Sequence, residues 1–155
     1  MSVSKTVQQQ YIRIVDRAME QAYDLKIPRE GWLTTMRKAL RMPAPQLARR
    51  AEVTKAAIYQ AERKEREGGI TVRQMRKLAN ALGGQLVYAI VLDDGDVNTC
   101  LRNQARTKAE KIVRRTSSHM ALEKQSLSDR QITWEIEQMT DQLVREMPPD
   151  FWDEP

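Results

Sequence analysis

Four side chains of different chemistry fall on one face of a short predicted helix: an ammonium, a methyl, a phenol and an amide. They belong to Lys55, Ala56, Tyr59 and Gln60, whose spacing matches one helical turn. On a helix placed in the major groove of DNA, ammonium and amide groups hydrogen-bond to base edges, and a methyl contacts the methyl of thymine. The pattern therefore predicts recognition of DNA.

Two short helices joined by a tight corner must position that face. Leu47, Ala48, Val53 and Ile58 are spaced to pack the first helix against the second. Thr54 is the expected cap for the free N–H groups of the second helix. We therefore predict a helix-turn-helix over about residues 44–63.

The distribution of charge supports this interpretation. Residues 31–77 hold 12 Lys/Arg against 4 Asp/Glu, and residues 101–119 hold 6 against 1. A basic block around a helix-turn-helix favours contacts with DNA phosphates. Residues 120–155 reverse the sign, with 3 Lys/Arg against 9 Asp/Glu. That acidic end suits either a basic protein partner or a solvated surface. For a protein partner, the expected apolar anchors are the stripe of Ile132, Ile136, Met139 and Leu143 and the Phe151-Trp152 pair.

Helical periodicity covers most of the remaining chain. We expect helices over residues 5–25, 32–40, 71–82, 97–123 and 128–146, with caps at Thr71 and at Ser126 or Ser128. The predicted organisation is an N-terminal helix (1–30), a DNA-binding domain (31–84), a strand and turn (85–96) and a helical partner-binding region (97–155).

One segment alone is a convincing strand. Residues 85–92 are apolar on both faces, and we find no second good strand to pair with them. An unpaired strand leaves its backbone groups exposed. We therefore expect pairing with a second copy of the chain, the alternative being an irregular edge within one subunit. The predicted dimer strand comprises Leu86, Val87, Tyr88, Ala89 and Ile90.

Other function classes are disfavoured by composition. One Cys and one His are too few for the usual structural zinc site, and no apolar run is long enough to span a membrane. His119 follows Ser117 and Ser118, but neighbours along one helix do not face each other. We expect neither catalysis, nor a metal or other cofactor, nor a small-molecule substrate. The N-terminus has no apolar signal core, so we expect a cytoplasmic protein.

Residues 32–82 resemble the lambda-repressor-like, or xenobiotic-response-element (XRE) type, helix-turn-helix domains. The resemblance implies contacts with bases or flanking phosphates from Gln46, Arg49, Thr54, Lys55, Ala56, Tyr59, Gln60 and Arg63. Two positions depart from the pattern. Glu52 stands where the family often has Gly, and Ala56 stands where a polar base-reading residue is common.

Nearly the whole chain resembles a bacterial family called mobile mystery protein A. The similarity lies in the Gly31-Trp32 pair, the stretches 84–89 and 118–123, and the terminal Phe151-Trp152-Asp153. Such proteins are encoded beside a Fic-domain partner, and Fic enzymes typically transfer AMP from ATP to a protein hydroxyl. The resemblance implies a toxin and antitoxin pair, in which an inhibitory helix reading Ser/Thr-x-x-x-Glu-Gly/Asn blocks the ATP site.

Two segments partly match that inhibitory pattern. One places Glu123 after Ser118 and His119, and the other places Glu137 after Thr133. Glu123 ranks first because it lies in a segment that carries the family resemblance. Both glutamates are also explained as ordinary carboxylates on a helix surface.

Together these observations predict a mainly α protein with a lambda-repressor-like core of five helices, one intersubunit strand and a C-terminal helical extension. The predicted function is a homodimeric antitoxin that binds palindromic operator DNA, represses its own operon and inhibits a Fic-domain toxin. The alternative is a stand-alone regulator whose C-terminal helices only dimerise or sense a signal.

Overall fold

The computed structural model describes residues 4–122 and 128–154, and within them the chain is mainly helical. The helices of these residues are α1 (Lys5–Ala22), α2 (Trp32–Ala39), α3 (Ala44–Ala51), α4 (Lys55–Glu67), α5 (Val72–Leu82), α6 (Val97–Leu122) and α7 (Asp129–Glu146). The chain divides into two compact units. One is Asp24–Ala89, and the other combines Met1–Tyr23 with Ile90–Pro155.

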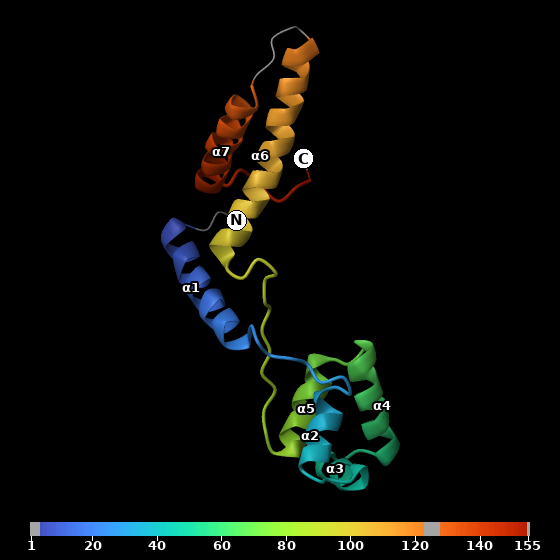
Figure 1. The fold of residues 1–155 in the computed structure, drawn as a ribbon. Coiled ribbons are helices and arrows are strands. Elements are labelled where there is room, and N and C mark those ends of the chain that lie inside the picture. Colours follow the sequence, from blue (N-terminus) through green and yellow to red (C-terminus); the bar gives the residue numbers. More distant parts are fainter. Residues whose placement is uncertain (1–3, 123–127, 155) are drawn as a thin grey trace. The chain divides into compact units, whose positions relative to one another are not determined.

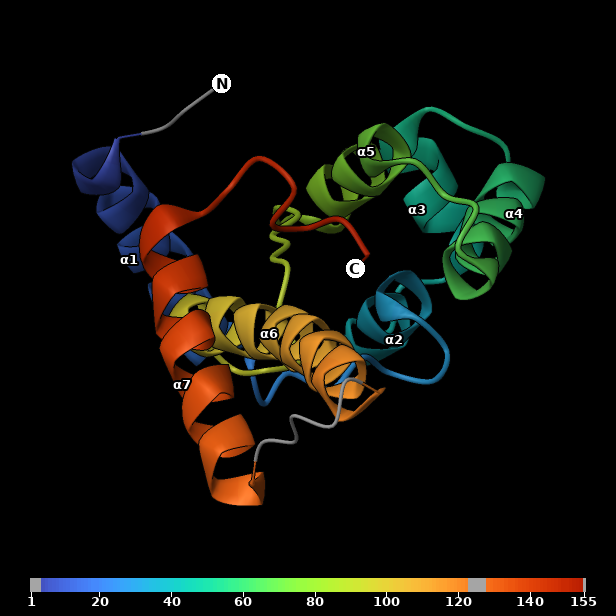
Figure 2. The same cartoon turned by 90° about the horizontal axis from the view of Figure 1, so that it is seen from above.

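The first unit packs α2, α3, α4 and α5 around one apolar core (Figure 2). Leu47 of α3 and Ile58 of α4 have no exposed surface, and Leu33 and Leu78 bring α2 and α5 to the same core. Partly buried side chains surround this centre, Val53 of the corner among them. The apolar spacing read from the sequence therefore identifies the faces that pack.

Local capping explains where these helices begin and end. The Thr54 hydroxyl accepts from the N–H of Ala57 at 3.1 Å. At the start of α5, Thr71 and Gln74 form a reciprocal capping box. Gly83 ends α5 in the left-handed region at φ 97°, a conformation that glycine adopts without the steric cost of a Cβ.

The second unit is built on a hairpin of α6 and α7, which lie side by side (Figure 1). Leu101, Ala105 and Ala109 recur every four residues along α6 and face the partner helix. Ile136 of α7, 5% exposed, packs against Ala109 and Val113 of α6. The hairpin is therefore held by a continuous apolar seam.

Helix α1 packs against the start of α6 in the same unit. Ile12 and Met19 are its buried side chains. The Asp16 carboxylate accepts from the N–H of Val97 at 3.0 Å, which caps the first turn of α6. The expected core of five helices is thus wrong in one respect. Residues 24–89 contain four helices, and α1 belongs with α6 and α7.

The expected strand is not shown. Within the described residues the structure contains no strand, and residues 85–92 form an irregular segment of a single chain. A β-strand is defined by backbone hydrogen bonds to a neighbouring strand. A single copy of this segment has no neighbouring strand among the described residues to form them. Val87 is 78%, Tyr88 66% and Ile90 82% exposed, whereas Leu86 is half-buried and Ala89 exposed.

Two apolar features expected to contact a partner are instead internal. The stripe of α7, with Ile132, Ile136, Met139 and Leu143, packs against α6. Phe151 is 1% exposed and belongs to the same hairpin core. Both expectations were wrong because an apolar stripe indicates that a face is buried but does not say against what.

The C-terminal turn is fastened to α6 by polar contacts. The Gln104 amide donates to the carbonyl oxygen of Phe151 at 2.9 Å. The buried ammonium of Lys108 donates to the carbonyl oxygen of Asp150 and lies 3.1 Å from its carboxylate. These contacts hold Phe151 in the core, while Trp152 remains 58% exposed. No helix among the described residues is long and apolar enough to cross a membrane.

Candidate nucleic-acid interface

The corner between α3 and α4 is a tight turn that depends on a left-handed residue. Glu52 ends α3 at φ 58° and ψ 41°, where a side chain with a Cβ costs roughly 1–2 kcal/mol. The N–H of Val53 returns to the carbonyl oxygen of Ala48 at 2.9 Å. The corner position therefore adopts a conformation that favours glycine, although a glutamate occupies it.

The eight residues predicted to contact DNA all lie on the exposed surface of the unit Asp24–Ala89. The α3 segment contributes Gln46 and Arg49, and Thr54 precedes α4. Helix α4 contributes Lys55, Ala56, Tyr59, Gln60 and Arg63. The structure thus brings them together on two consecutive helices and leaves each accessible to a ligand.

Four of these side chains have partners in the protein. Lys55 places its Nζ 5.8 Å from the ring centroid of Tyr59, a cation–π distance. Arg63 forms an exposed ion pair with Glu67 at 2.9 Å, and the hydrogen bond to that carboxylate raises the pKa of the Arg63 guanidinium. Thr54 accepts a backbone hydrogen bond through its oxygen, so its hydroxyl proton is still available to a phosphate.

A buried ion pair fixes α4 against α2. The Arg37 guanidinium binds the Glu62 carboxylate through two bonds, Nε–Oε1 at 2.6 Å and Nη2–Oε2 at 3.2 Å. The two side chains are 13% and 5% exposed. The hydrogen bond that Arg37 donates to Glu62 is the main cause that raises the pKa of the Arg37 guanidinium. This bidentate contact holds the helix that carries the exposed face in one orientation.

A second carboxylate of α4 caps α2, a contact between distant segments that no local sequence pattern predicts. Glu65 accepts from the N–H groups of Trp32 at 2.6 Å and Leu33 at 3.0 Å. A carboxylate at a helix N-terminus satisfies free donors and complements the helix dipole. Gly31 lies so close that an added Cβ would meet the Glu65 carboxylate at 2.9 Å. Glu62 and Glu65 together clamp one helix onto the other.

The structure describes the candidate inhibitory segment around Glu137 completely and the one around Glu123 only in part. Ser118 and His119 are exposed near the end of α6, whereas Glu123 lies outside the described residues. In the other segment, the Thr133 hydroxyl donates to the carbonyl oxygen of Asp129 at 3.0 Å.

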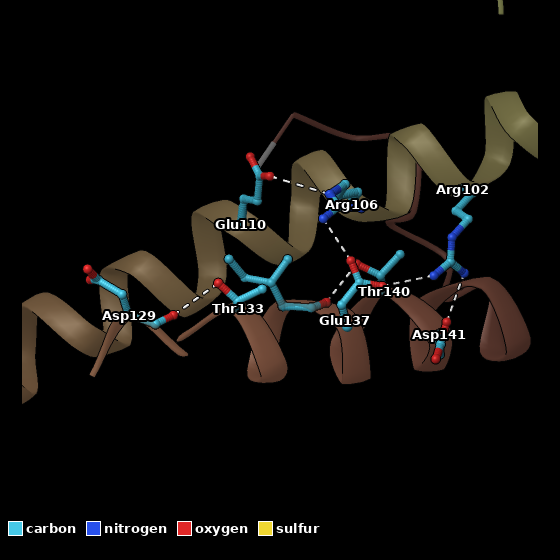
Figure 3. A network of polar contacts seen from close by, with 9 residues as sticks. Arg102, Arg106, Glu110, Asp129, Thr133, Glu137, Thr140 and Asp141 are labelled. Atoms are coloured by element: carbon cyan, nitrogen blue, oxygen red, sulfur yellow. Dashed lines mark hydrogen bonds and ion pairs between the residues drawn. The ribbon is translucent and has the colours of Figure 1, made fainter. Parts of the chain in front are cut away.

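Glu137 lies in a polar network between α6 and α7 (Figure 3). Its carboxylate contacts Arg102 at 3.0 Å and Arg106 at 2.7 Å. Arg102 also binds Asp141 at 2.8 Å, and the hydrogen bond to Asp141 is the main cause that raises the pKa of Arg102. Glu137 therefore already has two guanidinium partners in its own hairpin.

The described residues gather no group of three or more His, Cys, Asp and Glu side chains suited to a metal ion. Comparisons with protein-family models, with curated proteins and with solved structures found no match.

Proposed function

We propose that this chain is a homodimeric regulator that binds palindromic operator DNA through α4 and represses its own operon. One observation supports the proposal most directly. Helix α4 exposes a face made of Lys55, Ala56, Tyr59 and Gln60, and the Arg37–Glu62 ion pair holds this helix against α2. An orientation fixed by the protein core is what base reading needs, because hydrogen bonds to base edges tolerate little misplacement.

The basic surface supports the same proposal. Residues 31–77 carry a large excess of Lys and Arg, and Arg49, Arg50, Arg63 and Lys64 are exposed around the corner and along α4. Contacts of this kind with phosphates fix a protein on the duplex without reading sequence. They also make affinity fall steeply with salt because bound counterions are released.

The operator is expected to be an inverted repeat. A two-fold dimer presents two copies of α4, so the half-site centres lie about 10 bp, or a multiple of that, apart. Selection of binding sequences from a random DNA library tests this directly. Enrichment of an inverted repeat supports the proposal, and failure to enrich any sequence over the starting library contradicts it.

The exposed segment 85–92 is proposed as one part of the dimer contact. Its apolar side chains face solvent in a single chain, and pairing with a second copy would satisfy its backbone groups. Replacing Val87 with Pro removes a ladder hydrogen bond and should weaken the dimer. An unchanged dimer dissociation constant in sedimentation would show that the segment does not pair.

A second proposed activity is inhibition of a Fic-domain toxin through Glu123. The family resemblance supports it, and so does the engagement of the rival Glu137 by Arg102 and Arg106. In the proposed complex Glu123 pairs with the toxin arginine that would otherwise hold the γ-phosphate of ATP, because a carboxylate competes with phosphate for a guanidinium.

Co-expression with the neighbouring gene product tests this activity. Glu123→Ala should keep the complex and release AMP transfer, while Glu135→Ala, an exposed carboxylate on α7, should keep the toxin silent. Full inhibition by the Glu123→Ala chain would exclude this residue as the inhibitory group. If no complex forms with the wild-type chain, the stand-alone regulator becomes the better account, an account also favoured by the internal position of the α7 stripe.

A further inference from the structure

Helix α1 has a second apolar face beside its buried one. Ile12 and Met19 face the interior of the unit. Val7, Tyr11, Ile14 and Ala18 follow each other at steps of four, three and four residues, which places them in one stripe. Val7 is 39%, Tyr11 60% and Ile14 66% exposed. The helix therefore has more apolar surface than its own unit covers.

Tyr11 is the member of the stripe that also lines a groove in the same unit. The groove has a volume of about 1070 Å³ and is lined by α1, the start of α6 and the end of α7. Tyr11 and Val15 form part of one wall, and Trp152, 58% exposed, forms part of another.

The exposed apolar area is large enough to indicate an interface with another molecule. Val7, Tyr11, Ile14, Val15 and Trp152 together expose apolar surface on the order of 500 Å² per chain, since a large aromatic alone has 150–250 Å². Monomeric proteins rarely leave contiguous apolar patches larger than a few hundred Å². A stable interface buries roughly 800 Å² on each partner, so this patch supplies more than half of one side.

We propose that α1 of a second copy of this chain lies antiparallel against the stripe of α1, along the edge of the groove. A two-fold axis between residues 12 and 13 brings Tyr11 opposite Ile14 of the other copy, and Val7 opposite Ala18. Large side chains then meet smaller ones along the whole contact. A parallel pair would place Tyr11 against Tyr11 and Ala18 against Ala18, which leaves the two helices unevenly spaced. Opposed helix dipoles also favour the antiparallel pair.

Other features of α1 point to self-association. Within the stripe between Val7 and Ala18 every member is uncharged, and interface cores are depleted of charge. Segment 85–92, proposed above as one part of the dimer contact, ends beside α1, because the N–H of Leu92 donates to the sulfur of Met19 at 3.2 Å. The exposed Ile90 lies in the same unit. This inference deepens the proposed function by naming the second contact of the dimer.

Two tyrosines of equal exposure provide a matched test. Tyr11 is 60% exposed in the stripe, and Tyr23 is 61% exposed at the end of α1, turned away from the stripe by the helical period. Tyr11→Lys should weaken the dimer at least tenfold in sedimentation, while Tyr23→Lys leaves it unchanged. Both variants should keep the wild-type helical circular dichroism because both side chains are exposed.

Cross-linking tests the register. In a Cys100→Ser background, a mixture of Val7→Cys chains and Ala18→Cys chains should form disulfide-linked dimers, and neither chain alone should. Linking of Val7→Cys chains to each other would indicate a parallel pair and overturn the inference. So would a monomeric wild-type chain, or equal weakening by the two tyrosine variants. A dimer that behaves as expected but selects no DNA sequence would contradict the proposed function and leave this inference intact.

Discussion

In each unit of this protein an arginine of one helix binds a carboxylate of the neighbouring helix, but the two contacts differ in their exposure to solvent. In residues 24–89, Arg37 and Glu62 are 13% and 5% exposed. In the hairpin, Arg102 is 46% exposed, and its partners Glu137 and Asp141 are 36% and 47% exposed. The same chemistry is buried in one unit and solvated in the other.

That difference teaches which contacts position the helices. A buried charge that loses its partner is costly, whereas an exposed pair contributes roughly 0.2–1 kcal/mol. In the unit that carries α4, the buried Arg37–Glu62 pair therefore contributes to the orientation of the exposed face, together with the Glu65 cap and the apolar core. The hairpin depends on its apolar seam, and its ion pairs add little.

The largest effect should come from the seam of the hairpin. Phe151→Ala removes a side chain that is 1% exposed and should lower the free energy of unfolding by about 4 kcal/mol. Trp152→Ala, next to it and 58% exposed, should cost less than about 1 kcal/mol. Chemical denaturation of the two variants measures the difference. Equal losses would show that Phe151 is not the anchor of the C-terminal turn.

The buried ion pair should come next. Glu62→Ala leaves the Arg37 guanidinium buried without its carboxylate and should cost about 3 kcal/mol. Glu67→Ala removes another carboxylate of α4, whose pair with Arg63 is 71% and 60% exposed, and should cost about 0.3 kcal/mol. Thermal and denaturant unfolding of both variants checks the ratio. A loss below about 1 kcal/mol for Glu62→Ala would remove the contrast between the units.

A smaller effect is expected at the solvated network. Arg102→Gln breaks contacts with Glu137 and Asp141 and should cost about 1 kcal/mol or less at low salt. The loss should shrink in 1 M salt, where the Debye length falls to about 3 Å. Unfolding at the two salt concentrations tests the claim, and a large loss that does not depend on salt would contradict it.

The smallest effect should be a gain. Glu52→Gly relieves the left-handed backbone at the corner and should raise the free energy of unfolding by about 0.5–1 kcal/mol, part of the relief being lost to the greater freedom of the unfolded chain. Lys64→Gly, inside α4, should instead cost about 1 kcal/mol. Destabilisation by Glu52→Gly would mean that the corner tolerates its glutamate without strain.

Much of the secondary structure follows from local patterns in the sequence. The caps at Thr54, Thr71 and Ser128 mark helix starts that the structure confirms. Periodicity predicted the faces of α3, α4 and α5 that form the core.

The remaining features depend on contacts between distant residues, which no local pattern encodes. Asp16 capping α6, Glu65 capping α2 and Phe151 closing the hairpin each join segments more than 30 residues apart. The grouping of α1 with α6 and α7 follows from such contacts, and so does the direction of the α7 stripe. The DNA-contacting role of the residues on α4 stays a prediction.

The central claim is that α4 reads DNA bases, and discrimination by Gln60 tests it most directly. Gln60→Ala should weaken binding to the selected operator by about 1–3 kcal/mol and change binding to scrambled DNA much less, because an amide reads the edge of adenine. Asn80→Ala, which removes an exposed amide from α5, should change neither affinity. Equal losses on operator and scrambled DNA for Gln60→Ala would contradict the account.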